Sequence, residues 1–71
     1  MKLFVDDCRP APEGWVLAES YTRAIEILSE GGVEELSLDH DLSAYEDESG
    51  TDITYWMKYH LVDWPRRIIL H

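Results

Sequence analysis

The chain has 71 residues, of which 15 are acidic and 6 are basic, and its formal net charge is −9. This length predicts a single domain over residues 1–71, and the charge argues against direct nucleic-acid binding, which needs lysine and arginine to neutralise phosphates. The chain has no signal peptide and no apolar run long enough to span a membrane, so we expect a cytoplasmic protein, either bacterial or, if viral, in the host cytoplasm.

Two short strands are predicted at the start of the chain. Residues 2–5 form an apolar run that stops at Asp6 and Asp7, as expected for a buried parallel strand with polar side chains at its carboxyl end. Residues 8–14 contain two prolines and a glycine and are predicted to be a loop, and residues 15–18 are a second strand. This gap is short for a crossover, so an irregular connection or a reduced helix is expected in it.

The clearest predicted helix follows the second strand. Ser20 or Thr22 can cap its start, and Gly31 and Gly32 end it. Its apolar residues recur at spacings of three and four, which is typical of one helix face. They are Tyr21, Ala24, Ile25 and Leu28.

A strand, a helix and a final strand complete the chain. The strand covers residues 35–38, and the last strand covers residues 67–70. The helix runs from about residue 51 to residue 61, and Pro65 blocks its continuation. The stripe predicted to face the core consists of Ile53, Trp56, Met57 and His60. Strands that alternate with helices predict an α/β fold with a mostly parallel sheet.

Acidic side chains follow two of the predicted strands. Asp6 and Asp7 come after the first strand, and Asp39, His40 and Asp41 come after the third. Ligands of open α/β sheets bind outside the carboxyl ends of strands, so these carboxylates converge if the two strands are neighbours. Crowded carboxylates attract a cation, and oxygen ligands of this kind suit Mg²⁺. The alternative is that these acids are solvated turn formers.

Four segments carry a family resemblance. Residues 3–15 read Leu-Phe-Val-Asp-Asp-x-Arg-Pro-x-Pro-x-Gly-Trp, and residues 36–42 read Leu-Ser-Leu-Asp-His-Asp-Leu. Together with residues 50–56 and 68–71, they resemble the cyclic-phosphate-processing receiver-like family over nearly the whole chain. The resemblance implies a small, flavodoxin-like receiver domain of three layers. Its mostly parallel four-stranded sheet has the order 2-1-3-4, and two main helices accompany it.

The same resemblance implies a metal site. Asp6 and Asp7 look like the metal-binding acidic pair of receivers, and Asp39 looks like the phospho-accepting position. With Asp41 from the same segment, these residues are expected to bind a divalent metal, Mg²⁺ being the expected ion.

The resemblance also implies catalytic and phosphate-binding residues. Asp39, His40 and His71 are expected to be catalytic, since histidine titrates near neutrality and can move a proton. Arg9 is expected either to bind a phosphate oxygen or to form a salt bridge with Asp7 or Glu13 of its own loop.

Two functions of different classes follow from these residues. The first is a metal-dependent phosphoesterase or phosphate-binding domain that acts on cyclic phosphates. The alternative is a non-catalytic acidic protein that binds a basic partner, for example a viral inhibitor in the nucleic-acid groove of a host defence protein, through the acidic residues 45–48. A phosphorelay receiver ranks last, because the receiver's fifth strand and its lysine are absent.

The expected partners are a small phosphate ligand or a basic protein. The family usually continues beyond the final histidine, so the chain is expected to be a truncated or naturally minimal version. Its last strand, residues 67–70, is apolar and is expected to pair with a second copy or a partner.

Overall fold

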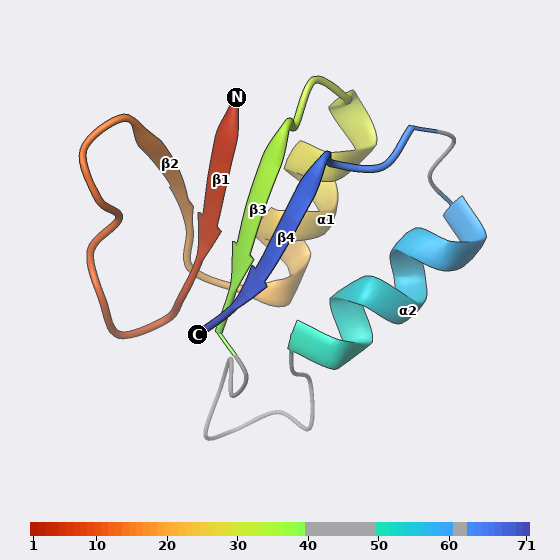
Figure 1. The fold of residues 1–71 in the computed structure, drawn as a ribbon. Coiled ribbons are helices and arrows are strands. Elements are labelled where there is room, and N and C mark those ends of the chain that lie inside the picture. The colour runs from red at the N-terminus through yellow and green to blue at the C-terminus, as the bar shows by residue number, and fades with distance from the viewer. Residues whose placement is uncertain (40–49, 61–62) are drawn as a thin grey trace.

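The computed structural model of the chain describes residues 1–39, 50–60 and 63–71 (Figure 1). The strands are β1 (Lys2–Val5), β2 (Trp15–Ala18), β3 (Glu35–Leu38) and β4 (Arg67–Leu70), and the helices are α1 (Tyr21–Glu30) and α2 (Gly50–His60). The strands pair in parallel in the order β2-β1-β3-β4. The predicted α/β class, strand order and two main helices are therefore confirmed.

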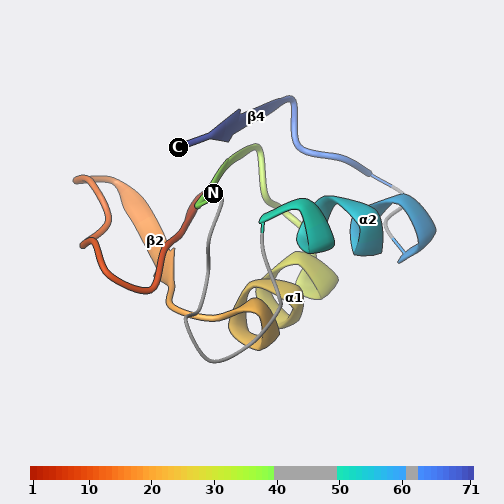
Figure 2. The same ribbon diagram turned by 90° about the horizontal axis from the view of Figure 1, so that it is seen from below.

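Both helices lie on the same face of the sheet, so the described residues form two layers and not the three implied by the receiver resemblance (Figure 2). The connections from β2 to β3 and from β3 to β4 advance across the sheet in one direction, and right-handed crossovers in one direction place their helices on one face. The connection from β1 to β2 runs the other way and would place a helix on the opposite face. However, its residues 6–14 include Pro10, Pro12 and Gly14 and form no helix.

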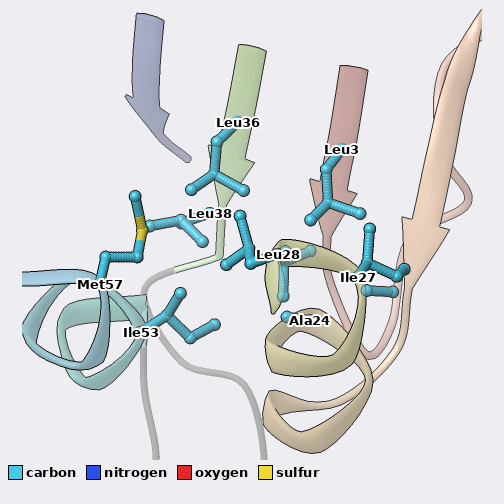
Figure 3. Packing of buried hydrophobic residues seen from close by; sticks show 10 residues of the cluster. Leu3, Ala24, Ile27, Leu28, Leu36, Leu38, Ile53 and Met57 are labelled. Atoms are coloured by element: carbon cyan, nitrogen blue, oxygen red, sulfur yellow. The ribbon is translucent and has the colours of Figure 1, made fainter. Parts of the chain in front are cut away.

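The covered face of the sheet forms the core. Leu3 lies opposite Leu36 and Val5 lies opposite Leu38 in the register of β1 and β3. Alternate residues of a strand point to opposite faces, so these four side chains point the same way, and all four are fully buried. The helices pack against them through Ala24, Ile27, Leu28, Ile53 and Met57 (Figure 3).

The opposite face carries the residues that alternate with this core. Phe4 lies opposite Leu17 on one side and Ser37 on the other, and Ser37 lies opposite Ile69. The apolar members of this row, Phe4, Leu17 and Ile69, are half-buried. No helix of the described residues covers this face.

The ends of α1 agree with the predicted capping. The hydroxyl of Ser20 accepts a hydrogen bond from the N–H of Arg23 at 3.1 Å, so Ser20, and not Thr22, is the cap. At the other end Gly31 has a φ of 83°, a left-handed value that glycine adopts without steric cost, and its N–H donates to the carbonyl of Leu28.

The predicted stripe of α2 is only partly in the core. Ile53 and Met57 are fully buried and Trp56 is half-buried, but His60 is exposed and stacks on Trp56 with 5.0 Å between ring centroids. The prediction that His60 faces the core is wrong, because the stripe turns away from the sheet at the last turn of the helix. Within the described ranges, neither helix is long and apolar enough to cross a membrane.

Candidate metal site at the strand ends

Three strands each place one polar side chain at the end of the sheet where the carboxyl ends of the strands meet. Asp6, Asp39 and His71 are the residues that directly follow β1, β3 and β4. The strand pairing continues through their backbones, since the N–H of Asp39 donates to the carbonyl of Val5 and the N–H of His71 to that of Leu38, both at 2.8 Å. One ligand atom from each of the three side chains lies within 4.8 Å of the other two.

Asp6 is the buried member of this group, with 2% of its surface exposed. Its Oδ1 accepts hydrogen bonds from the N–H groups of Cys8 at 2.8 Å and Arg9 at 3.0 Å, which form the turn that leaves β1. Its Oδ2 lies 3.0 Å from Nε2 of His71. Burial raises the pKa of Asp6, but the hydrogen bonds from Cys8, Arg9 and His71 together outweigh it and hold the pKa below its ordinary value. Asp6 is therefore an ionised carboxylate near neutral pH.

The imidazole of His71 is held on three sides. Nε2 faces Asp6, Nδ1 lies 2.7 Å from the hydroxyl oxygen of Ser37, and the ring stacks on Phe4 with 4.4 Å between centroids and 11° between planes. The side chain retains 17% exposure. The ring is thus fixed in orientation while one edge remains open to solvent.

Asp39 is the more exposed carboxylate of the group. It is half-buried, in contrast to Asp6, and it follows β3, which lies between β1 and β4. The group therefore combines one buried carboxylate, one more accessible carboxylate and one oriented imidazole.

The other predicted site residues lie elsewhere. Asp7 is exposed and is not a member of the group, because the turn that begins at Asp6 directs the Asp6 side chain into the site and leaves Asp7 outside it. Its carboxylate accepts a hydrogen bond from the thiol of Cys8, which raises the pKa of that thiol. Predicted residues His40 and Asp41 lie outside the described residues.

Arg9 has its backbone N–H at the site and its side chain exposed. Within the described residues no salt bridge joins its guanidinium to Asp7 or Glu13, the two partners expected in its loop. The salt bridge expected within this described loop is therefore not seen, and the side chain of Arg9 is exposed.

Two contributors to the site, Ser37 and Phe4, are absent from the residues identified in the sequence. A signal for them exists: Ser37 is the polar residue between two leucines of a buried strand, and this alternation places it on the face opposite the core. Once β1 and β3 are neighbours, Phe4 follows as the partner of Ser37 in register.

The donor set of two carboxylates and one imidazole suits a divalent metal. Mg²⁺ prefers an all-oxygen set, whereas imidazole is a ligand of transition metals, and carboxylates also suit Mn²⁺. A mixed set of this kind fits Mn²⁺ better than Mg²⁺, the ion expected from the acids alone.

The comparisons with known proteins point to one family. The model of a family described as the cyclic-phosphate processing receiver domain matches residues 1–71, which is the whole chain. Searches of curated proteins and of solved structures found no match.

Proposed function

Because the chain belongs to the cyclic-phosphate processing receiver domain family, we propose that it hydrolyses a cyclic phosphate at a divalent-metal site formed by Asp6, Asp39 and His71. The observation that carries this proposal is the convergence of these side chains from three strands, with ligand atoms within 4.8 Å of one another.

Charge explains why a cation is needed. A cyclic phosphate diester is an anion, and it would approach two carboxylates in a protein of net charge −9. Without a cation this approach is repulsive, because like charges at about 4 Å repel by about 1 kcal/mol even in water. A bound divalent metal would supply polarisation of the phosphoryl oxygens and a water of lowered pKa.

The reaction requires proton transfer as well as charge neutralisation. Hydrolysis adds the oxygen of one water to phosphorus, breaks one ring P–O bond and gives a proton to the released oxygen. Nε2 of His71 is directed toward Asp6, which supports a ligand role for His71 in place of the proton-transfer role expected from the sequence. His40 is then the histidine that we assign to proton transfer.

Arg9 completes the proposed site. Its guanidinium has the planar shape that binds two oxygens of one phosphate, and the backbone of the same residue already contacts Asp6. We assign it to phosphate binding.

The test begins with metal binding. We expect the wild-type protein to bind Mn²⁺ in isothermal titration calorimetry, and Asp39→Asn to weaken this binding at least tenfold, since even outer-shell partners contribute about 10- to 100-fold. Asp63→Asn is the matched control, because this exposed residue precedes β4 and lines one pocket with Gly32, at the opposite end of the sheet. It removes the same charge and should leave the affinity unchanged.

Turnover is measured next on a panel of five- and six-membered cyclic phosphate esters incubated with the protein and Mn²⁺. Because paramagnetic Mn²⁺ broadens phosphorus resonances, the metal is removed on a chelating resin before the products are identified by phosphorus NMR. We expect ring opening by the wild type and none by Asp39→Asn. Absence of Mn²⁺ binding at millimolar concentrations would contradict the metal site and would favour the alternative of an acidic protein with a basic partner. Binding without ring opening of any ester would leave a phosphate-binding domain and contradict the hydrolase.

A further inference from the structure

Ser37 occupies an unusual position for a hydroxyl group. It lies in β3 between two fully buried leucines, is only 6% exposed, and directs its oxygen to Nδ1 of His71 at 2.7 Å. Because it is buried behind His71, this hydroxyl does not face the ligand atoms of the group. It is therefore in place to act on the histidine and not on a substrate.

We infer that Ser37 is a positioning residue that fixes the orientation of the His71 ring and pairs with Nδ1 whichever ring nitrogen carries the proton. This inference rests on the proposed metal site. A histidine that binds a metal through one nitrogen usually has its other nitrogen held by a hydrogen bond, which orients the ring and selects the tautomer. Ser37 is the group that meets this requirement at Nδ1.

The metal-free arrangement follows from the chemistry of the neighbours. Oδ2 of Asp6 lies 3.0 Å from Nε2 of His71, and a carboxylate can only accept hydrogen bonds, so Nε2 carries the proton. In a neutral ring Nδ1 is then an acceptor, and the hydroxyl of Ser37 donates to it.

Metal binding through Nε2 requires the ring proton to lie on the other nitrogen. When Nε2 gives its lone pair to a cation, the ring proton lies on Nδ1, and the oxygen of Ser37 must accept it. A hydroxyl can donate or accept, so Ser37 satisfies Nδ1 in both arrangements. An aliphatic side chain of the same shape satisfies neither.

Phe4 supports the same geometry from another direction. Its ring lies nearly parallel to that of His71, at 11°, and limits tilting of the imidazole. The stack constrains the plane of the ring but cannot distinguish Nδ1 from Nε2. Rotation of the ring within this plane is therefore fixed by the contacts at its two nitrogens, Ser37 at Nδ1 and Asp6 at Nε2.

The experiment compares Ser37→Thr with Ser37→Val, which differ only by a hydroxyl against a methyl group. We expect Ser37→Thr to bind Mn²⁺ within about threefold of the wild type, and Ser37→Val to bind about 10- to 100-fold more weakly. Ser37→Ala, which adds no volume, provides the same loss of hydroxyl if the larger side chains disturb the strand. Circular dichroism of all three checks that the fold is retained. Equal affinities of the wild type, Ser37→Val and Ser37→Ala would overturn the inference.

A second measurement separates this inference from the metal site itself. Nitrogen-15 NMR of the metal-free protein at about pH 8, above the ordinary pKa of histidine, reports whether the unprotonated ring nitrogen accepts a hydrogen bond. We expect the Nδ1 resonance of Ser37→Thr to match that of the wild type, and that of Ser37→Val to move toward the value of a nitrogen without a hydrogen bond. Failure of the wild type to bind Mn²⁺ would refute the proposed function, whereas equal Nδ1 resonances in the wild type and Ser37→Val would refute the role of Ser37.

Discussion

The Nε2 atom of His71 lies 3.0 Å from the Oδ2 atom of Asp6, although the two residues are 65 positions apart in the chain. This contact joins the residue after β1 to the residue after β4, across the end of β3 between them. The site is therefore built from the tertiary fold and not from a local motif.

The first prediction concerns the pH dependence of stability. The pKa of Asp6 is lower in the folded protein than its ordinary value, so Asp6 stabilises the fold above that ordinary value, about 3.9. This contribution is lost as the pH falls through the lower, folded pKa. We expect Asp6→Asn to reduce the free energy of unfolding near neutral pH by about 1–3 kcal/mol and to flatten its dependence on pH in the acid range. Urea unfolding of both proteins at a series of pH values measures this, and parallel pH profiles would contradict it.

The second prediction concerns the carboxylate pair without metal. Asp39→Asn removes one of two neighbouring negative charges while preserving the size of the side chain, so we expect it to raise the metal-free stability by up to about 1 kcal/mol. The same substitution should abolish any stabilisation by added Mn²⁺. Thermal unfolding with EDTA measures the metal-free stability, and thermal unfolding with Mn²⁺ measures the stabilisation by the metal. A wild type and an Asp39→Asn that respond equally to Mn²⁺ would exclude Asp39 as a ligand.

The third prediction compares two leucines on neighbouring strands. Leu36 is fully buried in β3 and Leu70 is 63% exposed in β4. We expect Leu36→Ala to cost about 2–5 kcal/mol, through lost burial and the cavity left behind, and Leu70→Ala to change stability by no more than about 0.5 kcal/mol. Since small domains are stable by only about 5–15 kcal/mol, we expect the cooperative urea transition of Leu36→Ala to move to much lower urea concentration or to be lost. Similar effects of the two substitutions would show that α1 and α2 do not cover the face of the sheet that carries Leu36.

The fourth prediction concerns self-association, which we propose to occur through β4. Within the described residues this strand pairs with β3 alone, so its other edge presents backbone groups and the exposed side chain of Leu70. We expect a concentration-dependent dimer in sedimentation, which Leu70→Lys weakens because edge lysines oppose strand pairing. Tyr59→Lys, at a residue 62% exposed on α2, is the control. A wild type that stays monomeric at all concentrations would contradict this proposal.

Much of the fold could be predicted because short apolar runs and capping residues act locally. The run before Asp6, the cap at Ser20 and the glycine at position 31 each specify an element boundary without reference to the rest of the chain. Strand order and handedness also predict that both helices lie on one face of the sheet. The expectation of three layers came instead from the receiver resemblance.

The site was less predictable because it depends on the direction of side chains. Asp6 and Asp7 are equivalent in sequence terms, and only the turn after β1 decides that Asp6 enters the site while Asp7 stays exposed. The contacts of His71 with Ser37 and Phe4 depend on the register of β4 against β3 and of β3 against β1. No local pattern contains that information.

The contribution of one residue from each of β1, β3 and β4 has a consequence for folding. Parallel pairings join residues distant in sequence, and such non-local contacts form slowly, because loop closure must precede them. Since β4 follows the other described strands in sequence and lies at an edge of the described sheet, the group of Asp6, Asp39 and His71 is incomplete in any intermediate in which this strand has not paired. Local opening of β4 alone, with the core beneath α1 and α2 intact, would disassemble the site. Ligand binding should therefore suppress hydrogen exchange in β4 more than in any other strand.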